Sequence, residues 1–155
     1  MNVFIFSFFF WAGDVAYAGG IPECDLGLAD NGTWIESTTR IDFLGSASFN
    51  LPKNMSFVSQ SSTGGENPWH LAMFLSDVQG SAIKSINVYS SLRKELNLDT
   101  GRMKRLLCET TRNGYKALLF DHDAGDIAVI DAVGFQVIVH GPEAHSFVLN
   151  IIKNL

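Results

Sequence analysis

The C-terminal third of the chain sets the tightest limit on the fold, because short apolar runs alternate there with turns. Residues 115–120, 126–131 and 135–140 each have the length and the β-branched or aromatic content of a strand. The connections between them are short: an Asp- and Gly-rich loop at 121–125 and a Val-Gly turn. Strands joined by such short loops pair antiparallel, whereas parallel strands need a long crossover. This region therefore predicts an antiparallel meander.

A helix is expected after this meander, over residues 142–154. Pro142 suits the first turn of a helix, and Glu143 places an acid near the positive end of the helix dipole. The apolar residues that follow form one arc of a helical wheel: Ala144, Phe147, Val148, Ile151, Ile152 and Leu155. The pattern predicts that this helix packs on the sheet.

The upstream sequence predicts further strands and a second helix. Alternating apolar residues indicate a hairpin at 34–43 and 46–51 and a strand at 70–76. Residues 83–90 favour a further strand, with a helix as the alternative. Residues 59–68 have the composition of a polar loop. A helix over about 99–111 would place four side chains on one face: Met103, Leu106, Leu107 and Thr110. The predicted class is α+β, an antiparallel sheet of about six strands with two packing helices, at about 99–111 and 142–154.

The first residues of the chain predict export. Residues 3–13 are almost entirely apolar, but this run is too short for a membrane span, which needs about 20 residues. It is followed by Ala16-Tyr17-Ala18, a pattern suited to cleavage by signal peptidase after Ala18. The alternative is a buried N-terminal strand, because no Lys or Arg precedes the run. The expected organisation is a signal peptide at 1–18, an irregular leader at 19–33 and a single domain at 34–155. The expected location is periplasmic or secreted, with no membrane span after cleavage.

The chain contains two cysteines, Cys24 and Cys108. In an oxidising compartment an even number of cysteines favours a disulfide, and the alternative is two buried free thiols. On the expected helix, Cys108 points away from the apolar face. A bridge from the leader would then cross the outside of that helix as a surface strap.

Charge is unevenly distributed along the chain. Residues 84–116 hold eight of the 11 basic residues and three acids, whereas the flanking segments are acidic. This asymmetry predicts a basic face that could bind an acidic protein partner, with Trp69 as an aromatic anchor. The candidate partner-binding residues are Arg102, Lys104, Arg105, Arg112 and Trp69. Alternatively, the basic segment faces its own acidic flanks, and Trp69 is a core residue.

No nucleic-acid partner is expected, because the chain is acidic overall, is predicted to be exported, and has few aromatics among its basic residues. His140, Glu143 and His145 are the candidate metal ligands, because imidazoles and a carboxylate suit zinc. The residues would bridge a strand end and a helix start, and no recognised metal-binding spacing matches them. The loop from Asp121 to Asp126 lacks the Glu that a calcium loop requires at its last position. No cofactor is predicted.

The segment Phe43-Leu-Gly-Ser-Ala-Ser-Phe-Asn-Leu-Pro52 resembles the early strand of the PsbP-like α+β family, in which an extended apolar strand ends in a proline. The later order of helix, Gly-Tyr115 strand, meander and amphipathic helix is similar over about 110 residues. The resemblance concerns the fold, and it implies an exported accessory or binding role. It carries over no catalytic residue.

Together these observations favour an exported, non-catalytic module that binds a protein, as an inhibitor, an immunity factor or an assembly accessory. The alternative is a small metal-assisted hydrolase or ligand-binding protein that uses His140, Glu143 and His145 with the loop from Asp121 to Asp126.

Overall fold

The computed structural model describes residues 20–43, 47–63, 69–91, 103–122, 127–132 and 135–155. Most of these residues lie in antiparallel β-sheet. The strands are β1 (Glu36–Phe43), β2 (Ala47–Pro52), β3 (Met55–Thr63), β4 (Trp69–Ser76), β5 (Ser85–Ser91), β6 (Met103–Arg112), β7 (Tyr115–His122), β8 (Ile127–Ala132) and β9 (Phe135–His140). Seven of them form one sheet in the order β3-β4-β5-β9-β8-β7-β6, and β1 pairs with β2 separately. Two meanders therefore meet where β5 pairs with β9.

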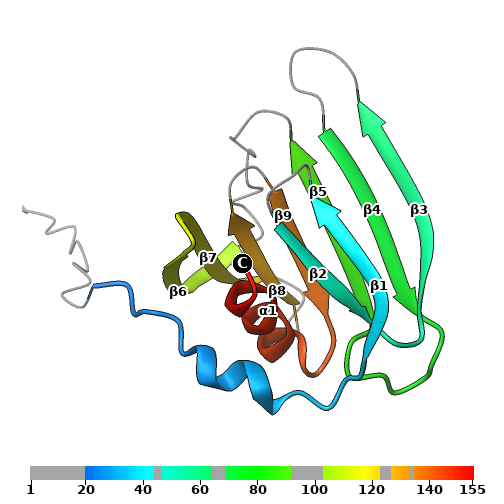
Figure 1. The fold of residues 1–155 in the computed structure, drawn as a ribbon, viewed down its shortest axis with the longest axis horizontal. Helices are drawn as coiled ribbons and strands as arrows, with labels where there is room; N and C mark the ends of the chain where they lie inside the picture. Colours follow the sequence, from blue (N-terminus) through cyan, green and yellow to red (C-terminus); the bar gives the residue numbers. More distant parts are fainter. Residues whose placement is uncertain (1–19, 44–46, 64–68, 92–102, 123–126, 133–134) are drawn as a thin grey trace, which may run out of the picture.

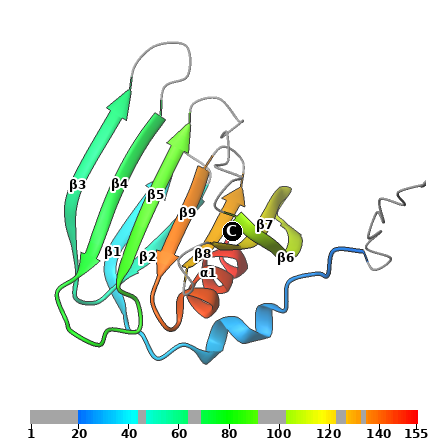
Figure 2. The same cartoon turned by 180° about the vertical axis from the view of Figure 1, so that it is seen from behind.

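Two helices complete the described part of the chain: a 3₁₀ helix, η1 (Leu26–Asn31), and an α-helix, α1 (Ala144–Lys153). The hairpin of β1 and β2 and helix α1 lie on the same face of the large sheet, as the front and back views show (Figures 1 and 2). Helix α1 packs against β8 and β9, and η1 runs along α1. Neither helix has the length and apolar content that crossing a bilayer requires. The expected α+β class with two packing helices is wrong, because the described protein is mostly β.

The segment expected to form a helix at 99–111 is the main error. Residues 99–102 lie outside the described residues, and the rest forms β6, paired antiparallel with β7. The ladder shifts register twice, between Met103 and Arg105 and between Leu106 and Cys108. Each irregularity adds a residue and interrupts the period of two. The apolar spacing along β6 therefore resembles that of a helix, although the backbone is extended.

Other boundaries follow the sequence more closely. The hairpin expected at 34–43 and 46–51 is confirmed as β1 and β2. The polar segment 59–68 was expected to be a loop, but residues 59–63 belong to β3, a strand that the sequence pattern did not predict, and residues 64–68 lie outside the described residues. Asn113 and Gly114 join β6 to β7 with positive φ angles of 47° and 85°, as the tight hairpin turn of an Asn-Gly pair requires.

The core lies between the large sheet and the layer formed by α1 and the β1–β2 hairpin. Phe147 of α1 is 1% exposed and occupies its centre. Its ring meets Trp34 edge-on at 5.2 Å and Phe49 at 5.9 Å between ring centroids. The large sheet contributes a further set of buried side chains: Phe74, Ile86, Val88, Ala117, Leu119, Val137 and Val139. Edge-on aromatic pairs add about 0.5–1.5 kcal/mol each beyond their burial, so Phe147 ties the two layers together.

Candidate functional site

The leader closes one edge of the large sheet. Glu109 of β6 donates its N–H to the carbonyl oxygen of Pro22 at 3.0 Å and accepts from the N–H of Cys24 at 3.2 Å. These bonds form a short parallel bridge between Glu23 and Glu109. The leader is therefore an additional strand-like segment on β6, which is the last strand of the sheet on that side.

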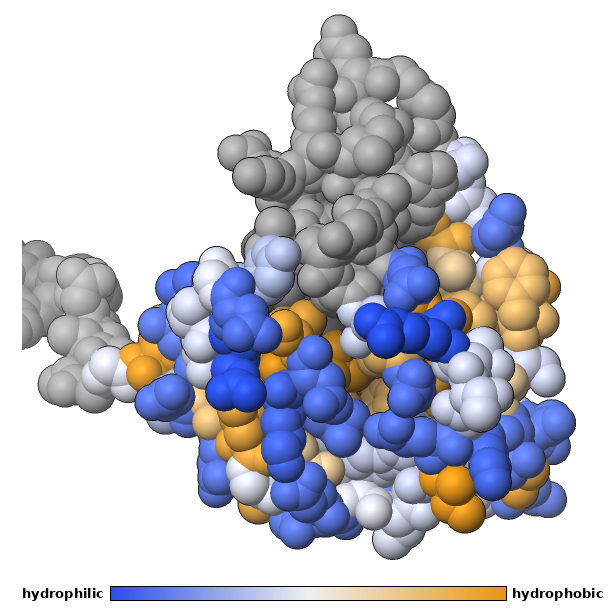
Figure 3. All heavy atoms as spheres, viewed as in Figure 1, coloured by the Kyte–Doolittle hydropathy of each residue, from blue (hydrophilic) through white to orange (hydrophobic). Residues whose placement is uncertain are grey.

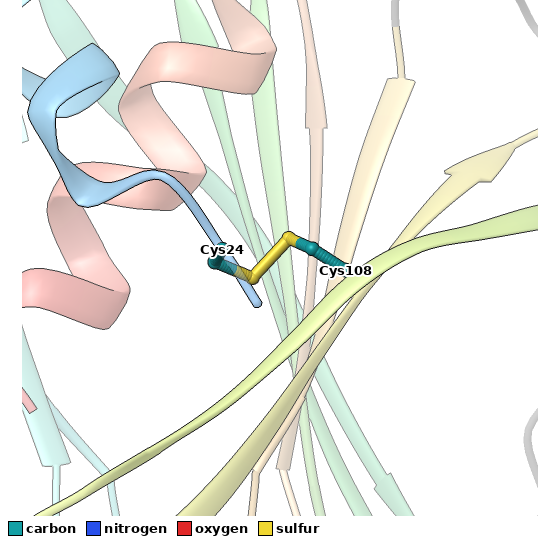
Figure 4. Close-up of a disulfide and its surroundings, with 2 residues drawn as sticks. All are labelled: Cys24 and Cys108. Carbon is teal, nitrogen blue, oxygen red and sulfur yellow. A yellow bond between two sulfur atoms is a disulfide. The ribbon is translucent and has the colours of Figure 1, made fainter. Parts of the chain in front are cut away.

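The predicted disulfide between Cys24 and Cys108 is confirmed, with a Cα–Cα distance of 4.9 Å. Figure 4 shows it joining the leader, beside α1, to β6. Both cysteines are buried, at 6% and 7% exposure. The expected surface strap is wrong, because Cys108 lies on a strand and faces the core rather than the outside of a helix. The bridge fixes the leader in the core of the domain.

Two further contacts hold the leader on α1. The ammonium of Lys153 contacts both carboxylate oxygens of Asp30 at 2.8 Å. Thr33 donates its backbone N–H and its hydroxyl to the two carboxylate oxygens of Glu143, at 2.6 and 2.7 Å. The first and last parts of the described chain are thus joined directly.

The three candidate metal ligands have different contacts and do not form a common site. Glu143 uses both carboxylate oxygens to bind Thr33. His140 ends β9, where its carbonyl oxygen accepts from the N–H of Lys84 at 2.7 Å. His145 lies exposed on the first turn of α1. Within the residues described, no three His, Cys, Asp or Glu side chains gather in a way that could hold a metal ion. Residues 123–126 of the second candidate loop lie outside the described residues.

Several side chains of the basic segment interact within the domain. Arg105 lies 3.6 Å from Asp121, and Lys116 lies 2.8 Å from Glu109. Arg112 donates to the carbonyl oxygen of Lys153 at 3.2 Å. The contact between Arg105 and Asp121 agrees with the alternative that the basic segment faces an acidic flank.

Lys104 is exposed, and it also interacts with another group of the protein. Arg102 lies outside the described residues, and Trp69 is described only as the first residue of β4. The acidic partner of the basic face stays a prediction.

A cleft of about 380 Å³ opens where the leader meets the sheet. It is lined by side chains from the leader, β6 and β7: Ile21, Glu23, Glu109, Thr110, Thr111 and Lys116. The ion pair of Lys116 and Glu109 lies in its wall. This cleft depends on the leader for part of its lining, so it exists only while the leader is held on β6.

The opposite edge of the large sheet is formed by β3, which sequence reasoning did not single out. In the described part of the chain, no segment pairs with its outer side. None of the strands β3, β4 and β5 contains an Asp, Glu, Lys or Arg residue. The absence of charge over three consecutive strands was the signal in the sequence that could have drawn attention to this edge.

Four exposed apolar side chains lie near one end of the β3–β4 hairpin, on both faces of the sheet and in the turn after β4. Phe57 and Val58 of β3 are 55% and 48% exposed, and Leu75 and Val78 are 40% and 48% exposed. Phe57 pairs with Phe74, and their ring centroids are 5.8 Å apart, so both side chains lie on one face of the sheet. Leu75 pairs with Ser56 and points to the opposite face at the same end of β3. The N–H of Asp77 donates to the carbonyl oxygen of Asn54, so the turn that follows β4 lies next to the start of β3. Apolar side chains are also visible on the β3 side of the space-filling view (Figure 3).

Comparison with family models, with curated proteins and with solved structures found no significant match. The resemblance to the PsbP-like family therefore stays a prediction.

Proposed function

We propose that this chain is an exported, non-catalytic protein-binding module, of the inhibitor, immunity or assembly-accessory type. The observation that carries the proposal is the set of exposed apolar side chains at one end of the β3–β4 hairpin, here called the apolar cluster: Phe57, Val58, Leu75 and Val78. Exposed apolar residues that stand singly are ordinary, but a cluster of them is typical of a surface that contacts another protein. Phe57, Val58 and Leu75 lie on strands that contain no Asp, Glu, Lys or Arg, and the central region of many protein interfaces is likewise depleted of charge.

The disulfide supports the export part of the proposal. Disulfides form and persist in the periplasm and outside the cell, and are rare in reducing compartments. The bridge between Cys24 and Cys108 is buried, and it holds the segment that follows the predicted signal peptide. A periplasmic or secreted location is therefore part of the proposed function.

The proposal is tested by capture of partners with the oxidised protein from envelope and secreted fractions of its host. The decisive variant is Val58→Asp with Val78→Asp, which introduces charge into the apolar cluster. The matched control is Leu28→Asp with Ile35→Asp. Leu28 and Ile35 are also exposed apolar residues, at 42% and 63%, but they lie in η1 and just before β1. Both double variants add the same charge at exposed positions.

One stoichiometric partner is expected with the wild type and with the control, and at least tenfold less of it with the cluster variant, because burying an uncompensated carboxylate is costly. Equal recovery with all three proteins would exclude this surface. The absence of any partner in both fractions would contradict the protein-binding function. Circular dichroism of each variant shows whether its fold is kept.

A further inference from the structure

The two edge strands of the large sheet, β6 and β3, differ in how well they are protected from pairing with another chain. Natural proteins protect edge strands with charged residues, short strands, bulges or a covering segment, because an open edge pairs readily with other chains. The β6 edge has this protection: it carries Lys104, Arg105 and Arg112, and the leader covers it through a disulfide and two backbone hydrogen bonds. The β3 edge has one bulge, but among the described residues it has neither charge nor cover.

β3 has the properties of a strand that can accept a neighbour. It is nine residues long, and its sequence combines Phe, Val and Thr with small polar residues. Its residues from Ser56 to Ser62 are exposed, whereas its inner edge is paired with β4 along its length, except at Val58, where the register shifts. In an edge strand, alternate N–H and C=O groups point away from the sheet, so β3 presents a row of them to the outside.

The shape and charge of this edge favour one flexible segment over a second copy of the chain. The register shift between Phe57 and Ser59 is a bulge, which increases the local twist of the strand. Two wide sheets with twisted edges align poorly along their length, whereas a single extended segment can follow the twist. Each copy also carries a net charge of −4 once the predicted signal peptide, with its single acid Asp14, is removed, so two copies repel each other.

We propose that β3 is a docking edge, at which a partner adds an extended, uncharged segment of its own chain as an eighth strand of the sheet. This inference rests on the proposed protein-binding function and gives its mode. Main-chain hydrogen bonds to β3 supply affinity in such complexes, and side-chain pockets supply specificity. Phe57 and Val58 are the exposed apolar contacts on β3, so the segment is expected to carry apolar residues opposite them.

The probe is a library of random linear peptides displayed on phage and selected against the oxidised full-length protein. Selected peptides are then synthesised, and amide hydrogen exchange of the protein is measured with and without them. The edge variant is Ser59→Lys with Ser61→Lys. The control is Thr38→Lys with Thr39→Lys, which adds the same charge at exposed strand positions of β1.

We expect uncharged peptides to be selected. When such a peptide binds, the exchange rate of alternate β3 amides should fall at least about tenfold. The edge variant should weaken binding by about tenfold or more, and the control should not. Three results would overturn strand addition: no selected peptide, bound peptides without protection of β3 amides, or self-association of the wild type that the edge variant abolishes. The last result would identify a second copy as the occupant. Each of these results refutes strand addition at β3 but not the proposed protein-binding function, which the capture of a host partner tests separately.

Discussion

Reduction of the disulfide is expected to destabilise the whole domain. Cys24 and Cys108 are 84 residues apart, so the bridge removes a large part of the conformational freedom of the unfolded chain. The chain-entropy relation gives about 4.6 kcal/mol for closure of a loop of this length at 25 °C. Domains of this kind have a free energy of unfolding of about 5–15 kcal/mol. The bridge is therefore expected to supply a large share of the total stability.

The assay is equilibrium unfolding in urea of the oxidised and the reduced wild type. With a slope of about 2 kcal/mol per molar urea, a loss of 4.6 kcal/mol lowers the midpoint by about 2 M. Reduction leaves both sulfur atoms in the core, so this comparison creates no cavity. The double variant Cys24→Ala with Cys108→Ala is the control, and its midpoint should not respond to the reductant.

A fall in stability of less than about 1 kcal/mol on reduction would refute this reasoning. It would mean that the leader detaches alone, and that the large sheet and α1 unfold independently of it. Hydrogen exchange would show the same result directly, because the amides of η1 would lose protection while those of β9 kept it.

Three further substitutions test contacts described above. Gly141→Ala should lower the free energy of unfolding by about 1–3 kcal/mol in urea titrations, because Gly141 has a φ of 149° and an added Cβ would clash with the carbonyl oxygen of Ala82; an unchanged midpoint would contradict this. Glu143→Gln should cost about 0.5–1.5 kcal/mol and speed amide exchange at Thr33, and equal exchange rates would show that the carboxylate is not needed there. Phe147→Ala should cost about 3–5 kcal/mol by thermal or urea unfolding, whereas a cost below 1 kcal/mol would mean that the two layers hold without this ring.

Local patterns in the sequence were enough for most of the strands and for α1. The meander from 115 to 140 and the helix after it are marked by short loops and by a helical apolar arc, which depend only on neighbouring residues. The pairing of Cys24 with Cys108 followed from the count of two cysteines and from the predicted compartment. The failure at 99–111 has a definite cause, because the bulges of β6 break the alternation by which a strand is recognised.

The site was harder to predict because its contacts are distant in sequence. Glu143 was taken as a metal ligand from its neighbours His140 and His145, but its carboxylate binds Thr33, 110 residues away. β3 was not predicted at all, because exposed edge strands lack the alternation that burial of one face imposes, and its polar residues are typical of a loop. Which edge of a sheet stays unpaired depends on the order of all its strands, and no local pattern encodes that order.

The pairing of β5 with β9 at the centre of the large sheet has a consequence for the time course of folding. β9 is the last strand in the chain, so the two meanders cannot join until nearly all residues have left the ribosome. Sheets built on such distant pairings fold slowly, on the scale of milliseconds to seconds. A chain that stays unfolded until its last strand is made is in the state that the proposed export would require, since its central pairing could then form after transport.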